Sequence, residues 1–482
     1  MALNAAVVWE VRTAGDDTNG GAFKAGASGT DYSQQDAKNT TGNNISTTDA
    51  VAAGTTTITS ATASFTSAIV GNVIYFQGGT GAIAAVWREC TVFTNSTTIT
   101  IDASIAVSTG MTMNIGGALL TLQTAATSMV TSNKVFVKIG TYTRTATTTF
   151  SAASADTSNT VPPNRLIGYS TTRADNGRPT IALSTNTGLT GLKFTTYGWE
   201  IRNFIVDCAS LGTSTGIDIG GGLTQLSNCK VSNFTLRGIQ GAAAGQNIIF
   251  ENEVTGGTSA ASAAINSTGS GSVIAENYVH DNACPGVIAG GATVIHNLCD
   301  TNTGASSDGI RITGGESGGA ILNNSVYNSG RDGIRASNNV LFAVSLVWNN
   351  ILSTNGAYGL TAITTNGIGA MPSFDGNAFF SNTSGTRFAG DDTGSVNAIN
   401  GVSPYSNVRD VILTADPFTN AAAGDFSLNT TTGGGAACRA AGFPGLFPGG
   451  LTTGSLDIGA AQHADPADTD RAAALVNGGL VR

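Results

Sequence analysis

Short apolar stretches separated by polar turn residues fill most of this 482-residue chain. Between residues 198 and 380 an Asn returns every 20 to 27 residues, and most of these Asn residues have an apolar residue two positions later. A turn-type residue follows five positions after each Asn, except after the first, where Cys208 stands. A fixed period of this length indicates a stacked repeat architecture. The recurring residues are Asn203, Asn228, Asn252, Asn277, Asn297, Asn324, Asn350 and Asn377.

A second pattern, a small residue followed by an aliphatic one, has the same period. Two patterns of equal period predict at least two strands in each coil, with each strand pairing in parallel with its copies at about 4.8 Å. Stacked Asn side chains are expected to bond from coil to coil. We therefore predict an all-β fold, a right-handed parallel β-helix of about eleven coils of about 24 residues. The pairs are Gly216–Ile217, Gly238–Ile239, Ala264–Ile265, Gly286–Val287, Gly309–Ile310, Gly333–Ile334 and Gly359–Leu360.

The periodicity changes at both ends of the repeat. Residues 1–118 hold a possible strand at 7–11 and several runs that alternate polar and apolar residues, which predicts a small antiparallel β domain. The β-helix is expected over 119–430, where an amphipathic helix from Leu119 to Met129 caps its first coil. Residues 431–482 are expected to close the fold and to end in a short helix with Asp465 as its N-cap.

Charge excludes several classes of partner. The chain has 22 basic and 31 acidic residues, a net charge of −9, and no Lys/Arg cluster that could follow a phosphate backbone. We therefore expect no nucleic-acid partner, and the acidity argues against adhesion to an anionic membrane. Neither a run of about 18 apolar residues nor a secretory signal pattern is present in the sequence, so we expect no membrane span and no secretion through a signal peptide.

The sequence offers no cofactor or metal motif. The six Cys residues include no CxxC pair and are expected to be reduced and buried. The three His residues form no HExxH motif, and Asp16–Gly20 lacks the downstream Glu of a calcium loop, so it is interpreted as a turn.

Two sets of charged residues follow the repeat. Glu251, Glu276 and His296 each stand directly before a repeat Asn, so they are expected to stack as a stripe on adjacent coils. Paired carboxylates of this kind can act as acid and base or nucleophile in glycoside hydrolysis. These three residues are weak catalytic candidates, because a solvated polar row explains the same spacing. Asp308-Gly-Ile-Arg311 and Asp332-Gly-Ile-Arg335 predict an exposed structural Asp/Arg ladder or, alternatively, a site for an anionic sugar.

The helix near residue 122, the strand at 135–139 and Gly140-Thr-Tyr142 resemble the opening of pectate-lyase-like β-helices in phage tailspikes. Asp416-Pro-Phe418, Gly424–Leu428 and Leu456–Ala460 resemble the closing segments of such proteins. The layout is similar to that of bacteriophage virion proteins such as tailspikes, head fibres and capsid-decoration spikes.

This resemblance implies a virion structural protein that is assembled in the host cytoplasm and acts extracellularly in host attachment. It also implies a homotrimer that docks on other capsid or tail proteins through its N-terminal domain or C-terminal tail, and contact with host surface glycan. One alternative is a polysaccharide depolymerase, a hydrolase or lyase that acts on host capsule or lipopolysaccharide. A bacterial surface β-helix protein is the second alternative.

Overall fold

The structure of the chain is a computed structural model. It describes residues 3–38, 45–152, 163–185, 188–243, 245–258, 261–313, 319–338, 344–364, 373–391, 396–397, 409–439, 441–442 and 456–462. The chain divides into two compact units. The first comprises residues 1–211 and 216–230, and the second comprises residues 212–215 and 231–482.

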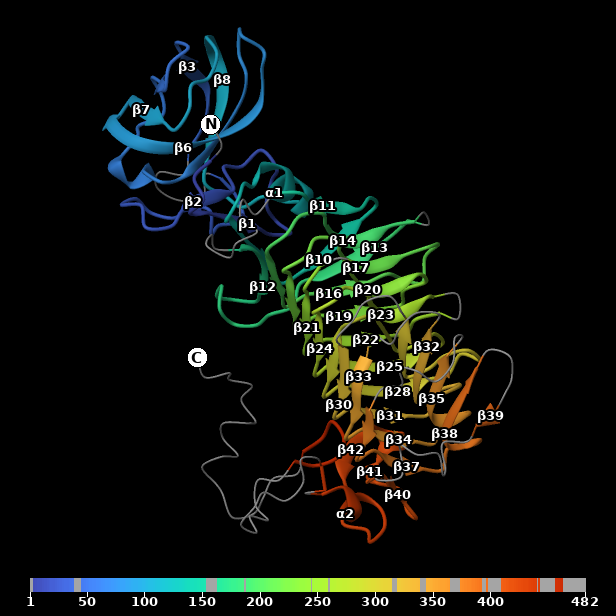
Figure 1. Ribbon diagram of the computed structural model, residues 1–482. Helices are drawn as coiled ribbons and strands as arrows, with labels where there is room; N and C mark the ends of the chain where they lie inside the picture. Colours follow the sequence, from blue (N-terminus) through green and yellow to red (C-terminus); the bar gives the residue numbers. More distant parts are fainter. Residues whose placement is uncertain are drawn as a thin grey trace. The chain divides into compact units, whose positions relative to one another are not determined.

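An antiparallel barrel lies at the start of the first unit (blue in Figure 1). The barrel is closed in the order β3-β4-β7-β6-β5-β8, and its core is made of alternate residues such as Ile58, Phe76, Ile99 and Met113. The predicted antiparallel strands are therefore present. The elements are β3 (Ser46–Ala52), β4 (Thr57–Thr59), η1 (Ser67–Ile69), β5 (Val73–Gly78), β6 (Ile83–Asn95), β7 (Thr98–Ile101) and β8 (Ser108–Ile115).

The first unit also contains the opening coils of a parallel β-helix with three strands per coil. The sequence pattern placed strand β1 (Val7–Val11) in the N-terminal β domain. In the structure β1 lies outside the barrel and pairs in parallel with β9. Its partner β2 (Ala22–Lys24) is antiparallel. The coil strands are β9 (Lys134–Lys138), β10 (Thr141–Arg144), β11 (Thr148–Phe150), β12 (Asn164–Tyr169), β13 (Thr180–Leu183), β14 (Thr190–Phe194), β15 (Trp199–Arg202), β16 (Ile205–Asp207), β17 (Thr215–Ile219), β18 (Gln225–Ser227) and β19 (Lys230–Ser232).

Helix α1 (Leu122–Ser128) lies where the sequence predicts a capping helix. The Thr121 side chain caps it by accepting a hydrogen bond from the Thr124 N–H, at 3.2 Å. Leu122, Ala125 and Ala126 are buried on its inner face. Asp17 fixes the start of the helix, because its carboxylate accepts from the Thr121 N–H and hydroxyl.

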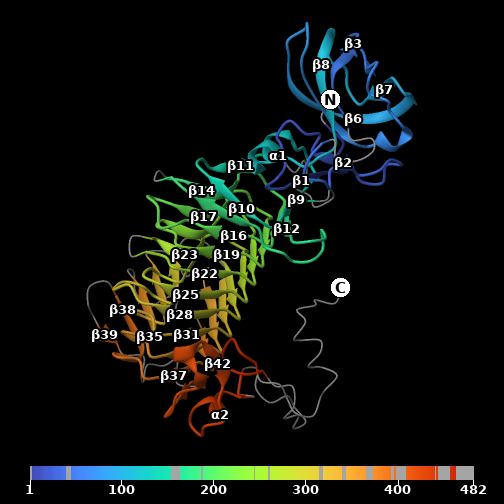
Figure 2. The same ribbon diagram turned by 180° about the vertical axis from the view of Figure 1, so that it is seen from behind.

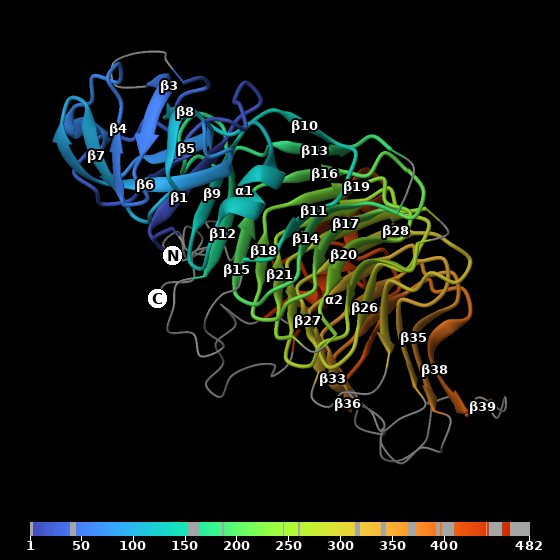
Figure 3. The ribbon, with the colours of Figure 1, turned by 90° about the horizontal axis from the view of Figure 1, so that it is seen from above.

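The second unit stacks its strands into three parallel sheets, which form the three sides of each coil (Figures 2 and 3). Counted over both units, the second sheet has eleven described strands, which agrees with the predicted number of coils. In the second unit the first sheet contains β21 (Ile248–Phe250), β24 (Val273–Ala275), β27 (Thr293–Ile295), β30 (Gly319–Leu322), β33 (Val344–Trp348) and β36 (Ser373–Asp375). The second contains β22 (Glu253–Thr255), β25 (Tyr278–Asn282), β28 (Leu298–Asn302), β31 (Ser325–Tyr327), β34 (Ile351–Ser353), β37 (Ala378–Phe380) and β40 (Val411–Ile412). The third contains β20 (Arg237–Gly241), β23 (Ala263–Ser267), β26 (Val287–Ala289), β29 (Ile310–Thr313), β32 (Ile334–Asn338), β35 (Tyr358–Thr364) and β38 (Gly385–Asp391), and β39 (Val396–Asn397) pairs antiparallel with β38 at its edge.

Two stacks of buried Asn side chains run through the turns at either end of the second sheet. In the first stack each amide donates to the carbonyl oxygen of the next, as between Asn252 and Asn277, at 3.0 Å. In the second stack Asn282 bonds to Asn302 in the same way, at 2.9 Å. The predicted coil-to-coil bonding is confirmed in this unit, and the turn-type residues five positions later supply the second stack.

The first two repeat Asn residues do not occupy the ladder position. Asn203 and Asn228 have positive φ angles, 65° and 50°, and lie at the left-handed turn residue one position earlier. Phe204 and Cys229, both fully buried, take the ladder position there. The position predicted for these two residues was wrong by one, because Asn suits both the left-handed turn and the hydrogen-bonded stack. Their side chains still bond from coil to coil, since the Asn228 amide donates to Asn203 Oδ1 at 2.7 Å.

A small C-terminal subdomain closes the second unit. Its elements are β41 (Phe418–Asn420), η2 (Ala421–Ala423), β42 (Asp425–Leu428) and α2 (Gly435–Cys438). Phe418, Phe426 and Leu428 pack on outward residues of the second sheet, including Tyr327 and Phe380. The helix predicted from Asp465 lies outside the described residues.

Candidate functional sites

The predicted stripe of Glu251, Glu276 and His296 lies on the left-handed turn between the first and second sheets. All three residues have φ angles of 55° to 56°, and their backbone N–H groups bond to the next coil. Both Glu side chains are exposed, and His296 is half-buried. The three residues therefore occupy one equivalent position on successive coils, as predicted.

The C-terminal segment 456–462 follows this row of turns. Burial lowers the pKa of His296, although Glu276 and the Ala460 backbone both act to raise it. The Asn323 amide, in the next turn of the row, donates to the Asp457 carbonyl at 3.0 Å. The His296 end of the stripe therefore contacts the chain's own closing segment.

A denser group of reactive side chains lies on the outer side of the second sheet, and we call it the Tyr278–His280 cluster. It contains Glu253 from β22, Tyr278, His280 and Asp281 from β25, and Asp300 from β28. The Tyr278 and His280 rings stack with centroids 4.0 Å apart. The strand register on both sides of β25 brings these residues together, since Glu253 of β22 pairs with Tyr278 and Asp300 of β28 pairs with His280.

Carboxylates surround both rings of the cluster. The His280 Nδ1 atom lies 2.8 Å from Asp281 Oδ2, and Nε2 lies 3.3 Å from Glu253 Oε1. Carboxylate oxygens accept hydrogen bonds, so each ring nitrogen of His280 faces an acceptor. The Tyr278 hydroxyl donates to Asp300 Oδ2 at 3.4 Å.

The two ends of this hydrogen-bonded group differ in burial. Asp300 is 7% exposed, and burial raises the pKa of its carboxyl group. Burial also raises the pKa of Tyr278 to about 12. The Asp281 side chain, by contrast, is 65% exposed. The cluster therefore combines a carboxyl group that retains its proton more readily with a carboxylate open to solvent, the division of roles that general acid and base catalysis needs.

The repeat itself holds the signal that locates this cluster. Glu253 and Tyr278 stand one position after a ladder Asn, and His280 and Asp300 stand three positions after one. Side chains on a strand alternate between faces, so these positions all point outward from the second sheet. The predicted stripe uses only the position before each Asn and therefore does not include the cluster.

The Asp/Arg ladder on the third sheet is buried, contrary to the expectation of an exposed pair. Asp308 is fully buried, and it accepts from Arg311 Nε and Arg331 Nη2, each at 2.7 Å. Asp332 is 1% exposed and accepts from Arg335 Nη1 at 2.8 Å. Both carboxylates accept charged hydrogen bonds from arginines inside the fold, which indicates a structural role.

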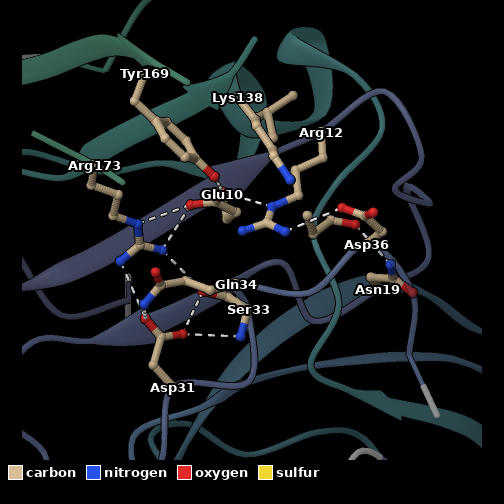
Figure 4. A network of polar contacts seen from close by, with 12 residues as sticks. Glu10, Arg12, Asn19, Asp31, Ser33, Gln34, Asp36, Lys138, Tyr169 and Arg173 are labelled. Carbon is tan, nitrogen blue, oxygen red and sulfur yellow. Dashed lines mark hydrogen bonds and ion pairs between the residues drawn. The ribbon is translucent and has the colours of Figure 1, made fainter. Parts of the chain in front are cut away.

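A second buried network lies in the first unit, around Glu10 of β1 (Figure 4). Its carboxylate is fully buried between Arg12 Nε and Arg173 Nη2, each at 2.8 Å, and it also accepts from the Tyr169 hydroxyl. Arg173 reaches on to Asp31 at 3.2 Å. Burial and then the Glu10 charge raise the pKa of Tyr169. The network ties the 31–36 loop to the first coils, and its polar groups are satisfied by one another.

The described part of the chain contains no cluster of three or more His, Cys, Asp or Glu side chains that could hold a metal ion. Within the same residues, no helix has the length and apolar character to cross a membrane. None of the six Cys residues forms a disulfide and all are buried, and burial raises the pKa of Cys299 to about 12.

Neither a protein-family model nor a curated protein matches this chain. Among solved structures, ORF18 of Geobacillus virus E2 is similar at 13% identity and a TM-score of 0.42, covering 56% of this chain and 57% of its own. Pectate lyase Pel9A is similar at 14% identity and a TM-score of 0.43, covering 72% of this chain and 92% of its own. An alginate lyase from Paenibacillus sp. str. FPU-7 is similar at 12% identity and a TM-score of 0.36, covering 55% of this chain and 94% of its own.

Proposed function

We propose that this chain is a bacteriophage virion protein whose β-helix attaches to glycan on the host surface through the Tyr278–His280 cluster. The observation that carries the binding role is the stacked Tyr278–His280 pair, which is flanked by three carboxylates on an outward sheet face. Aromatic rings pack on the apolar face of a sugar ring, and carboxylates accept hydrogen bonds from its hydroxyl groups.

The virion role is supported by the resemblance of the opening of the β-helix. Helix α1, strand β9 and Gly140-Thr-Tyr142 follow one another in the structure, and the Tyr142 hydroxyl donates to the Lys138 carbonyl at 2.8 Å. The barrel β3–β8 precedes this opening and is a candidate for docking on capsid or tail proteins.

Glycan binding is tested with the full chain on host surface polysaccharide, by surface plasmon resonance or a glycan array. We expect Tyr278→Ala to weaken binding at least about tenfold, because it removes the stacking surface. Thr143→Ala, at an exposed outward position on β10 of the same sheet, is the matched control and should bind normally. Equal binding by both variants would remove the cluster from the proposal. Mass spectrometry and cryo-EM of purified particles test the virion role separately, and absence of the chain from particles would refute it.

The same cluster supports a second candidate function, cleavage of the glycan. Asp300 has a raised pKa and is suited to protonate the glycosidic oxygen of the leaving sugar, while Glu253 or Asp281 activates a water molecule or attacks the anomeric carbon. Incubation with host polysaccharide should then release reducing ends. Asp300→Asn should abolish the release without abolishing binding, whereas release of unsaturated uronates would indicate elimination and not hydrolysis. If the wild-type chain binds glycan and no new ends form, the attachment role stands alone.

A further inference from the structure

The outer side of the first sheet in the second unit is unusually apolar for an outward sheet surface. Two rows of side chains run across β21, β24, β27, β30 and β33, in register from coil to coil. Nine of these ten outward positions are apolar, none is charged, and all are half-buried or exposed. We call this surface the outer apolar face: Ile248, Phe250, Val273, Ala275, Thr293, Ile295, Ala320, Leu322, Leu346 and Trp348.

This surface contrasts with its neighbours in two respects. In the first unit, six of the eight corresponding outward positions of the same sheet are polar or charged, as expected for a sheet that faces water. One row is Lys134, Arg165, Glu200 and Gln225, and the other is Phe136, Ile167, Arg202 and Ser227. On the second sheet, outward apolar residues such as Leu298 and Tyr327 pack beneath the C-terminal subdomain. Among the residues that the structure describes, the cluster formed by that subdomain contains none of the outer apolar face.

The extent of the face indicates an interaction surface. Five strands at about 4.8 Å extend for about 24 Å along the stack. Soluble monomers rarely leave a continuous apolar surface of this kind in water, because burying it is favourable by roughly 25 cal/mol per Å². Ile248 is the most exposed of the ten residues, at 46%, and the other nine are half-buried.

The apolar composition of the face and the acidic charge of residues 231–482 together indicate which kind of partner binds there. A glycan or nucleic acid requires hydrogen bonds or charges, and Thr293 supplies the one hydroxyl among the ten positions. A lipid surface usually requires a basic rim, but residues 231–482 hold 18 acidic residues, 9 arginines and no lysine. Two such acidic segments repel each other unless they meet over an uncharged surface. The outer apolar face is such a surface, and its regular spacing is shared by every copy of the chain.

We propose that the outer apolar face is the surface through which copies of this chain associate. The outer apolar faces of neighbouring copies pack against one another around a rotation axis, and closed rotational symmetry limits the number of copies. A trimer is the number that the phage resemblance implies. This proposal does not depend on glycan binding.

Sedimentation velocity of the full chain over a range of concentrations tests the proposal. We expect the wild type to associate and Ile295→Glu to dissociate at least about tenfold more readily, because the change places a charge in the contact. Gln225→Glu, on an exposed outward position of β18 in the same sheet, is the matched control and should behave as wild type. A monomeric wild type, or an unchanged mass for Ile295→Glu, would overturn the proposal.

A second readout keeps the test independent of folding. All six native Cys residues are buried, so an introduced surface Cys can be cross-linked selectively with a bis-maleimide. Ala275→Cys should give cross-linked dimers, because each chain then carries one accessible thiol and the reagent joins two, and Gln225→Cys should not. A chain that associates only after removal of residues 463–482, or that binds neutral liposomes as a monomer, would show that the tail or a lipid occupies the face instead.

Discussion

Substituting one Asn of the first ladder should destabilise the protein far more than its size suggests. Asn324 is fully buried, and its Oδ1 accepts from both the backbone N–H and the side-chain amide of Asn297, at 2.9 and 3.0 Å. Its own amide donates to the carbonyls of Val294 and Leu322 and to Asn350 Oδ1, each at 3.0 Å. Asn324→Ala removes all five hydrogen bonds at once.

The magnitude follows from the groups left behind. The buried backbone N–H of Asn297 loses its acceptor, while the Asn297 amide keeps the carbonyls of Ile274 and Ile295. An unsatisfied buried polar group costs about 1–3 kcal/mol. The total loss of stability is therefore about 3–5 kcal/mol, including the space left by the amide. Asn328→Gly is the matched control, because Asn328 has φ of 52°, which Gly adopts freely, and its amide makes one bond of 3.3 Å, to Thr301.

Urea unfolding followed by circular dichroism, together with amide hydrogen exchange, measures the effect. We expect a lower midpoint for Asn324→Ala and faster exchange of the amides in the coils that contain Asn297 and Asn324, with Asn328→Gly close to wild type. If the two variants unfold at the same urea concentration, the ladder is not a source of stability and the reasoning fails.

Three further predictions rest on buried ionisable groups. Glu10→Gln should cost about 3–5 kcal/mol in thermal unfolding, because Arg12 and Arg173 lose their charged partner, while Asp36→Asn, at a 51% exposed partner of Arg12, should cost under about 1 kcal/mol; equal losses would contradict this. Burial raises the pKa of Asp300, so protonation favours the folded form, and the wild type loses stability as the pH rises above about 4 through the folded-state pKa. The melting temperature of Asp300→Asn relative to wild type should therefore be higher at pH 7 than at pH 4, and a constant difference would argue against a raised pKa. The six buried Cys residues should react with a thiol reagent at pH 8 only in denaturant, and fast labelling of the native chain would reveal local opening.

The sequence predicts the stacked coils well because each coil requires the same residue types at the same positions. Inward residues such as Val254, Val279 and Cys299 return at a constant offset from the ladder Asn, and all three are fully buried. The third strand of each coil was not predicted. Its members on the first sheet, such as Ile248–Phe250 and Val273–Ala275, are apolar on both faces, so no alternation reveals a strand.

The repeat pattern could not predict contacts between residues that are far apart in the sequence. Glu10 meets Tyr169 and Arg173, more than 150 residues away, through loops that follow no period. Nor does spacing reveal that Asp308 is shared by Arg311 and Arg331, since only one of the two arginines belongs to the repeated Asp-Gly-Ile-Arg pattern. Burial of these carboxylates is a property of the assembled coils and not of any one of them.

The ladder also constrains where chemistry can occur on this fold. A residue in the ladder position has its polar capacity taken up by the coils above and below, as the five bonds of Asn324 illustrate. The left-handed position before it requires a fixed backbone conformation, so its side chains lie in a row along the turns and do not converge. Outward positions on adjacent strands are free of both constraints and lie within one strand spacing of one another. For that reason the Tyr278–His280 cluster, at offsets of one and three residues, is a better place to seek ligand chemistry than the Glu251 stripe.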